Sequence, residues 1–205
     1  MAQAHALITR PLQGLLLAAG RGTRFGADKL LHPLADGTTL ALTAARNLQD
    51  ALPAVLAVVH GHAPELAARL AQAGVRVTVC PRTGEGMGTS LSWGVAQSRE
   101  AGGWLVALAD MPWIQPATIR AIAAAVTGPH VIAAPVYQGK RGHPVAFGRD
   151  YREQLLELNG DQGARSLLAA HAGNLVLLPC DDAGVLRDVD YPWQLAEFEG
   201  MPARE

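Results

Sequence analysis

The chain has 205 residues, of which 49% are hydrophobic and 5% aromatic, and its formal net charge is −1. That length suffices for a domain that buries most of its apolar surface, and abundant Ala and Leu with few aromatic residues favour a layered α/β core. A charge near zero, without a basic stripe, argues against a nucleic-acid surface. No apolar stretch reaches transmembrane length, and residues 1–11 lack the apolar segment of a secretory signal.

Apolar runs alternate with helical stretches along the chain, as a βαβ pattern requires. We expect strands near 13–19, 54–60, 75–80, 104–109, 130–136, 144–148, 174–179 and 185–189. Helices are expected near 39–51, 63–73, 88–100, 116–127, 149–158, 163–172 and 192–199. Gly74 and the Gly128-Pro129 pair follow helical stretches as stop signals, and Pro116 suits the first turn of a helix.

This order of elements predicts a three-layer Rossmann-like α/β fold with a mostly parallel, twisted sheet. Residues 13–199 are expected to form one domain, with a flexible arm at 1–12 and a frayed tail at 200–205. The short turn at 138–142 indicates an antiparallel excursion in the second half. Its cations, Lys140 and Arg141, either cover the ligand cleft or project into solvent.

The most informative segment is 14–31, where a short apolar run breaks into a loop rich in glycines and cations. Glycines let backbone N–H groups approach a ligand, and cations supply charge opposite to phosphate. The glycines are Gly20, Gly22 and Gly26, and the cations are Arg21, Arg24 and Lys29. The loop therefore suits a polyphosphate.

Three kinds of phosphate loop compete for this segment. A Walker loop requires Lys after its last glycine, but Ala27 follows Gly26. A dinucleotide fingerprint fails because the glycine spacing is one residue longer and the second strand ends in His60-Gly61-His62 rather than an acid. A nucleoside triphosphate held by loop amides, one Arg and one Lys is the interpretation that we favour.

Two carboxylates are candidates for a metal that accompanies the triphosphate. With sheet order 3-2-1-4, strands 1 and 4 are neighbours where the winding reverses, so Asp110 should lie beside the Gly20 loop. Mg²⁺ prefers carboxylate, water and phosphate oxygens, which makes Asp110 a metal-ligand candidate. Asp190 is the second candidate, with Asp188 on the same expected strand face as the alternative. Asp190 would equally serve as a cap for the final helix.

The segment from Leu17 to Lys29, Leu-Ala-Ala-Gly-x-Gly-x-Arg-Phe-Gly-x-x-Lys, resembles the opening motif of nucleotidyltransferases with a Rossmann-like fold. Phe25 departs mildly from the Met that is more usual there. Further matches narrow the resemblance to the molybdenum cofactor cytidylyltransferases, which are similar to molybdopterin-guanine dinucleotide synthase. These matches are Asp110-Met111-Pro112, Gly142-His143-Pro144, 160–165 and Asp188-Val189-Asp190.

The resemblance implies a role for each matching residue. Arg24 would hold the β and γ phosphates, Lys29 would neutralise the α-phosphate, and both would be catalytic together with Asp110. The loop from Pro81 to Ser90 would border base and ribose, although Ser90 is equally explained as a first-turn helix residue. The implied nucleotide-binding set is Leu17, Ala18, Ala19, Gly20, Gly22, Arg24, Lys29, Pro81, Gly88, Ser90 and Asp110. His143, Asp161 and Arg165 would bind the second substrate, with His143 as a positioning donor.

The implied reaction is Mg²⁺-dependent transfer of CMP from CTP to molybdopterin, which gives molybdopterin cytosine dinucleotide and pyrophosphate. Ala19 favours CTP over GTP, because the guanine-using sister enzymes resemble Leu-Ala-Gly-Gly here and a methyl group narrows the base site. The alternatives are a guanylyltransferase, another small-molecule nucleotidyltransferase, or a non-catalytic nucleotide or pterin carrier. The carrier fits less well, because a regulator need not keep metal-binding acids.

Cellular context follows from the same patterns. Cys80 and Cys180 are too few for a disulfide framework and indicate a reduced, cytoplasmic protein. We expect a monomer or weak homo-oligomer that uses no nucleic acid and no membrane. Its product would pass to a molybdoenzyme or that enzyme's chaperone.

Overall fold

The computed structural model describes residues 10–20, 25, 28–161 and 163–199. A single mixed sheet runs through this part of the chain, in the order β3-β2-β1-β4-β7-β5-β6, with β8 paired to β5. The four strands β3, β2, β1 and β4 are parallel, and β7 runs antiparallel between β4 and β5. The strands are β1 (Gln13–Ala18), β2 (Val55–His60), β3 (Arg76–Cys80), β4 (Gly103–Leu108), β5 (Ile132–Tyr137), β6 (Lys140–Arg141), β7 (Val145–Gly148) and β8 (Leu175–Pro179).

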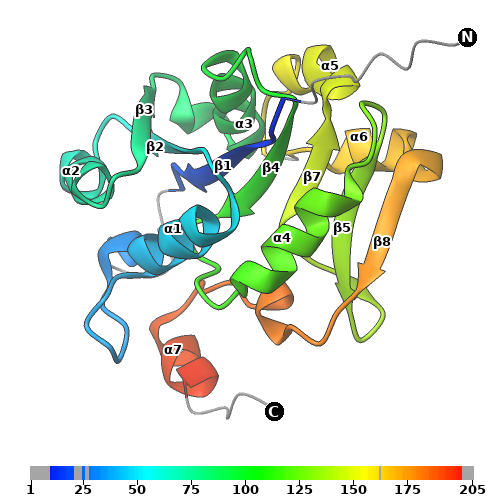
Figure 1. Ribbon diagram of the computed structural model, residues 1–205. Coiled ribbons are helices and arrows are strands. Elements are labelled where there is room, and N and C mark those ends of the chain that lie inside the picture. The colour runs from blue at the N-terminus through cyan, green and yellow to red at the C-terminus, as the bar shows by residue number, and fades with distance from the viewer. Residues whose placement is uncertain (1–9, 21–24, 26–27, 162, 200–205) are drawn as a thin grey trace, which may run out of the picture.

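Helices cover both faces of this sheet (Figure 1). On one face α1 packs against α2 and α4, and on the other α3 packs against α5. The helices are α1 (Leu40–Ala51), α2 (Pro64–Gln72), α3 (Met87–Ala96), α4 (Pro116–Ala125), α5 (Arg152–Leu156), α6 (Arg165–Ala170) and α7 (Pro192–Glu199). Short 3-10 turns are η1 (Lys29–Leu31), η2 (Thr83–Glu85), η3 (Arg149–Tyr151), η4 (Ala172–Asn174) and η5 (Ala183–Leu186). The predicted fold class is confirmed.

Strand β1 lies at the centre of the sheet and is buried along its whole length. Successive side chains of a strand point to opposite faces. Leu16 and Ala18 therefore join the core beneath α1, α2 and α4, whereas Leu15 and Leu17 join the core beneath α3, α5 and α6. Each fully buried Leu contributes about 1.5–3 kcal/mol of hydrophobic stabilisation. Packing in the two cores fixes the position of β1, and with it the position of the first residues of the glycine loop.

The carboxyl ends of β1 and β4 lie side by side. Leu17 is in register with Leu108, and the Ala109 N–H donates to the Leu17 carbonyl at 3.1 Å. The predicted strand order 3-2-1-4 is confirmed, so Gly20 and Asp110 both leave the sheet at its switch point. The antiparallel excursion of β5, β6 and β7 is confirmed as well.

The strand predicted at 185–189 is wrong. This segment contains the 3-10 turn η5 followed by irregular chain. The buried Asp182 carboxylate accepts the N–H groups of Gly184 and Gln115 and so bends the chain. Val185 and Val189 are fully buried in different clusters, which explains the strand-like apolar pattern without a sheet partner.

Several other boundaries also differ from the sequence prediction, two of them by more than two residues. The helix expected at 149–158 is divided into the 3-10 turn η3 and the short helix α5, and helix α3 ends at Ala96 rather than near residue 100. The predicted arm at 1–12 and tail at 200–205 fall mostly outside the described residues, so this division of the chain stays a prediction. Within the described part of the chain, no helix has the length and apolar character needed to cross a membrane.

Candidate active site

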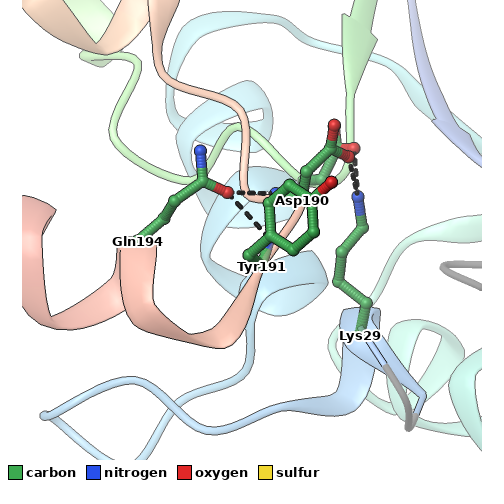
Figure 2. Close-up of polar contacts among 5 residues, drawn as sticks. Lys29, Asp190, Tyr191 and Gln194 are labelled. Atoms are coloured by element: carbon green, nitrogen blue, oxygen red, sulfur yellow. Dashed lines mark hydrogen bonds and ion pairs between the residues drawn. The ribbon is translucent and has the colours of Figure 1, made fainter. Parts of the chain in front are cut away.

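Lys29 lies between two carboxylates at the carboxyl edge of the sheet. Its ammonium is 2.8 Å from Asp110 Oδ2. It is also 3.4 Å from Asp190 Oδ1, a contact drawn in Figure 2. The Lys29 side chain is only 9% exposed, compared with 24% for Asp110 and 39% for Asp190. The structure thus brings together three residues that are far apart in the sequence, and both carboxylates remain accessible to a ligand.

Asp110 occupies a turn that is held from several sides. The Met111 N–H donates to the Leu108 carbonyl, which closes the turn after β4. Helix α1 reaches the same turn through Asn47, whose side-chain amide donates to the Pro112 carbonyl at 2.8 Å. The Val189 N–H donates to the Asp110 carbonyl at 3.0 Å and so ties the Asp190 segment directly to the Asp110 turn.

A small apolar cluster includes Val189, the residue before Asp190. Phe25, Leu40, Val189 and Leu195 form it, and Trp113 packs against it. These residues come from the glycine loop, α1, the segment before α7, and α7 itself. The cluster therefore links several segments that surround the candidate site.

A cavity of about 730 Å³ opens beside Lys29 and Asp110. Its lining includes residues at the ends of β1 and β4 and at the start of α3. Gly86, at φ 107°, precedes α3, and a Cβ there would lie 2.3 Å from the Gly160 carbonyl carbon. The full lining is Leu17, Ala19, Gly20, Lys29, Leu30, Gly84, Gly86, Met87, Ser90, Leu108, Asp110, Asp161 and Arg165.

A second cavity of about 460 Å³ adjoins the first and shares Asp161 and Arg165 with it. Apolar side chains such as Val106 and Phe147 make much of its wall, and His143 and Asp188 supply polar groups. Arg141 also lines this cavity, so one cation of the 138–142 turn does face the cleft. Two neighbouring cavities with charged groups at their junction suit a reaction between two substrates.

Burial changes the acidity of two groups near the second cavity. Desolvation lowers the pKa of His143, an effect that the Asp110 carboxylate partly offsets. The buried Nδ1 atom of His143 has no hydrogen-bond partner among the described residues. Desolvation raises the pKa of Asp188, and the nearby carboxylates of Asp110 and Asp190 act in the same direction.

The predicted site residues divide into three groups. Ala19, Gly20, Lys29, Ser90 and Asp110 line the larger cavity, His143 lines the smaller one, and Leu17, Asp161 and Arg165 line both. Ala18, Pro81 and Gly88 do not line the larger cavity: Ala18 lies in the core under α1, Pro81 is exposed, and Gly88 packs on Asn159. Arg21, Gly22, Arg24 and Gly26 lie outside the described residues.

Sequence reasoning missed Leu30 and Leu108 in the lining of the larger cavity. Gly84, Gly86 and Met87 also line it, and they belong to the 81–90 loop that was expected to border base and ribose, although none of the three was named as a site residue. The glycine-rich run at 84–88 was a usable signal, because a glycine just before a helix often allows close approach of another backbone segment. The 160–165 segment is that neighbour, since the Gly88 N–H donates to the Gly160 carbonyl at 2.8 Å. The glycine run predicts a close approach, but the identity of the approaching segment depends on the fold and has no local signature in the sequence.

The two accessible carboxylates fit a divalent cation with hard-oxygen preference. Among the described residues no group of three acid, His or Cys side chains forms a complete metal cage. Mg²⁺ usually keeps several waters and binds through one or two carboxylates together with substrate phosphates. Asp110 and Asp190 match that ligand set. In this structure the Lys29 ammonium balances the negative charge of the two carboxylates.

Residues 14–181 match the family model of the MobA-like NTP transferase domain. This chain belongs to that family. The purine catabolism protein PucB of Bacillus subtilis is 31% identical over 88% of this chain and 92% of its own length. Nicotine blue oxidoreductase of Paenarthrobacter nicotinovorans is 30% identical over 86% of this chain and 91% of its own.

Solved structures agree with this family. Rv0371c of Mycobacterium tuberculosis superposes with a TM-score of 0.80 at 29% identity, covering 92% of this chain and 97% of that one. A second structure of Rv0371c, with a TM-score of 0.78 and 28% identity, is a complex with manganese. The chain is thus a nucleotidyltransferase, and a relative binds a divalent metal.

Proposed function

We propose that this chain transfers CMP from CTP to molybdopterin, with Mg²⁺ as its metal. The observation that carries the proposal is the Lys29, Asp110 and Asp190 cluster beside two cavities that share Asp161 and Arg165. Nucleotidyl transfer needs little covalent help from a protein, so positioning and charge neutralisation dominate. The cluster and the paired cavities offer both.

The reaction joins a terminal phosphate oxygen of molybdopterin to the α-phosphorus of CTP. The bond from that phosphorus to the bridging α–β oxygen breaks, and pyrophosphate leaves with the electron pair. An anionic phosphate needs no general base, so His143 orients the acceptor rather than deprotonating it. Lys29 stabilises the charge that grows on the α-phosphate, and Arg24 holds the β and γ phosphates.

Asp110 and Asp190 would hold the Mg²⁺ ion. When bound, the ion acts as a Lewis acid that neutralises phosphate oxygens. The two carboxylates would also hold the Lys29 ammonium beside the metal site, because it lies 2.8 Å from Asp110 and 3.4 Å from Asp190.

Ala19 supports CTP as the donor. It is buried, with 6% exposure, and it lines the larger cavity, so its methyl group narrows the space for a base. A methyl-sized difference in a pocket is worth about 1–3 kcal/mol of discrimination. The smaller cavity supports a flat heteroaromatic acceptor, because its apolar walls meet the polar groups of His143 and Asp188. A molybdoenzyme or its chaperone would receive the product.

Pyrophosphate release tests this function. Each of CTP, GTP, ATP and UTP is supplied with Mg²⁺, with and without molybdopterin, and the product is identified by mass spectrometry. We expect release only with molybdopterin and at least about tenfold higher kcat/KM for CTP than for GTP, in line with the methyl-sized discrimination. Equal use of GTP would instead support a guanylyltransferase, and no turnover with any nucleotide would support a carrier.

Asp110→Asn provides the inactive control. Removal of a metal-organising carboxylate should lower kcat by a few orders of magnitude, or about 3–5 kcal/mol of transition-state stabilisation. Asp150→Asn changes an exposed acid at η3 and should leave kcat at the parent value. Near-parent turnover of Asp110→Asn at saturating Mg²⁺ would refute the metal assignment.

A further inference from the structure

Gln194 holds the backbone on which Asp190 stands. Its side-chain oxygen Oε1 accepts the Asp190 N–H at 2.7 Å and the Tyr191 N–H at 2.8 Å. In the view of Figure 2, Gln194 lies on one side of Asp190 and Lys29 on the other. One amide oxygen thus organises two successive residues at the edge of the candidate metal site.

The start of α7 explains why Gln194 is available for this contact. Pro192 is the first helical residue and has no N–H, and Gln194 is the third. A Gln at this third position commonly reaches back to the N–H of the residue before the helix. The Gln194 N–H in turn donates to the Tyr191 carbonyl at 3.1 Å. Here the backward reach extends one residue further, to Asp190.

The surroundings of Asp190 mean that its backbone position determines where its carboxylate lies. The preceding residue, Val189, is fully buried and donates its N–H to the Asp110 carbonyl at 3.0 Å. The Asp190 side chain, by contrast, is 39% exposed. A short side chain on a fixed backbone has a small reach, so the Gln194 and Asp110 hydrogen bonds together set where the carboxylate lies relative to Lys29.

We propose that Gln194 is a positioning residue that fixes Asp190 for metal binding. The proposal rests on the proposed function in one respect, namely that Asp190 holds the metal ion. Gln194 touches neither substrate nor metal in this role. It restricts the backbone of Asp190 and Tyr191. Removing the Gln194 side-chain acceptor should therefore lower the affinity of the site for the metal ion.

Mn²⁺ is the probe, because its free concentration is measured by electron paramagnetic resonance. The full chain is titrated with Mn²⁺ in the presence of saturating α,β-methylene-CTP, an analogue that cannot transfer CMP. Gln194→Met keeps the length of the side chain but removes the acceptor, and should weaken Mn²⁺ binding about tenfold, as loss of an outer contact to a metal ligand commonly does. Gln194→Glu keeps an acceptor at the same reach and should restore parent affinity.

Ala196→Gly is the matched control. It weakens the same helix at an exposed position without touching the Gln194 contact, so it should lower thermal stability but leave Mn²⁺ affinity at the parent value. Parent-like Mn²⁺ affinity of Gln194→Met would overturn the proposal. So would equal weakening by Ala196→Gly, because Gln194 would then act only through helix stability.

Asp190→Asn separates this proposal from the proposed function. It should weaken Mn²⁺ binding at least as much as Gln194→Met does. Unchanged affinity in Asp190→Asn would overturn the positioning role together with the metal assignment of Asp190. The pyrophosphate assay would still report on CMP transfer, because that assay does not depend on which acid holds the metal.

Discussion

At the residue scale, Lys29 combines two electrostatic tasks. Its ammonium lies 2.8 Å from Asp110 and 3.4 Å from Asp190, in a side chain that is 9% exposed. Without a bound nucleotide the ammonium offsets the repulsion of the two carboxylates. A divalent cation would compete with the ammonium for the same oxygens. Under the proposed function, a bound triphosphate would attract both positive charges and relieve this competition.

Lys29→Met should therefore separate metal affinity from turnover. We expect Mn²⁺ to bind the variant about tenfold more tightly than the parent when no nucleotide is present, because a positive charge within 4 Å of the ligands has gone. The kcat should nevertheless fall sharply, since in the proposed reaction Lys29 stabilises charge that grows during transfer. Weaker Mn²⁺ binding by the variant in nucleotide-free titrations would contradict this account.

Arg24→Ala is the comparison for Lys29→Met. The sequence motif assigns Arg24 to phosphates that are already charged in the ground state, so its loss should mainly raise the KM for CTP. Lys29→Met should mainly lower kcat. Parent-like kinetics in both variants would remove the glycine loop from the triphosphate site.

Residue-level prediction worked where topology alone decides a position. Asp110 follows strand β4, and the order of the sheet brings it to the glycine loop whatever the side chains do. The sequence favours Asp190 as the second carboxylate and leaves Asp188 as the alternative, because a role as helix cap explains Asp190 equally well. In the structure Asp188 lines the smaller cavity, whereas Asp190 pairs with Lys29. Gln194 had no sequence signal beyond its place near a helix start.

At the scale of elements, helix α7 and the glycine loop share the apolar cluster of Phe25, Leu40, Val189 and Leu195. Leu195 is 7% exposed, so Leu195→Ala should lower the free energy of unfolding by about 2–4 kcal/mol. The same variant should weaken Mn²⁺ binding, because α7 carries Gln194, whose side chain accepts the Asp190 N–H. Urea titration and Mn²⁺ titration measure the two effects.

Leu177→Ala is the control for that variant. Leu177 lies on β8 and is 49% exposed, so its truncation should change the free energy of unfolding by less than about 0.5 kcal/mol and leave Mn²⁺ affinity alone. If Leu195→Ala destabilised the fold without changing Mn²⁺ affinity, α7 would support the structure but not the site.

The turn before β7 makes stability depend on pH through His143. Burial lowers the pKa of His143, with Asp110 opposing the shift and Arg141 and Arg165 adding to it. Below the ordinary His pKa of about 6.5 the unfolded chain takes up a proton that the folded chain does not. Stability should therefore fall as pH drops below that value, by at most about 1.4 kcal/mol per pH unit for one proton.

His143→Gln tests this dependence. Glutamine does not titrate, so the loss of melting temperature between pH 7.5 and pH 5.5 should be smaller in the variant than in the parent. Equal losses in the two proteins would show that His143 does not contribute. Above pH 7 both states of the parent hold His143 neutral, so the pH slopes of the two proteins should coincide there.

Element prediction succeeded for strands whose apolar runs meet a sheet partner and failed where burial has another cause. The β1 and β4 runs were found within one residue at each end. The run at 185–189 also begins and ends with an apolar residue, but Val185 and Val189 are buried in two different clusters without a sheet partner, and Asp182 bends the chain between them and β8. Periodicity reports that a side chain is buried and does not identify the neighbour that buries it.

At the scale of the whole molecule, the reversal of winding between β1 and β4 creates one crevice with two cavities. The larger cavity lies over the parallel half of the sheet and includes Ser90 from α3. The smaller one lies toward the antiparallel half and includes His143. Arg165, at the start of α6, lines both. A parallel half for the donor and an antiparallel half for the acceptor would give each substrate its own set of contacts.

The Michaelis constants of three variants test this division. Ser90→Ala should raise the KM for CTP about fivefold and leave the KM for molybdopterin unchanged, because one neutral hydrogen bond is worth about 1 kcal/mol. His143→Gln should raise only the KM for molybdopterin. Arg165→Ala should raise both by about tenfold or more, since a charged hydrogen bond is worth about 1.5–3 kcal/mol and this side chain borders both cavities. Leu177→Ala serves as the control, because Leu177 lies on the edge strand β8 and lines neither cavity, so both KM values should stay at the parent level. Two outcomes would refute this division: Arg165→Ala changing the KM of only one substrate, or Ser90→Ala and His143→Gln changing the KM of the same substrate. Either result would mean that the two cavities do not bind separate substrates. The assignment of donor and acceptor to the two halves of the sheet would then be wrong.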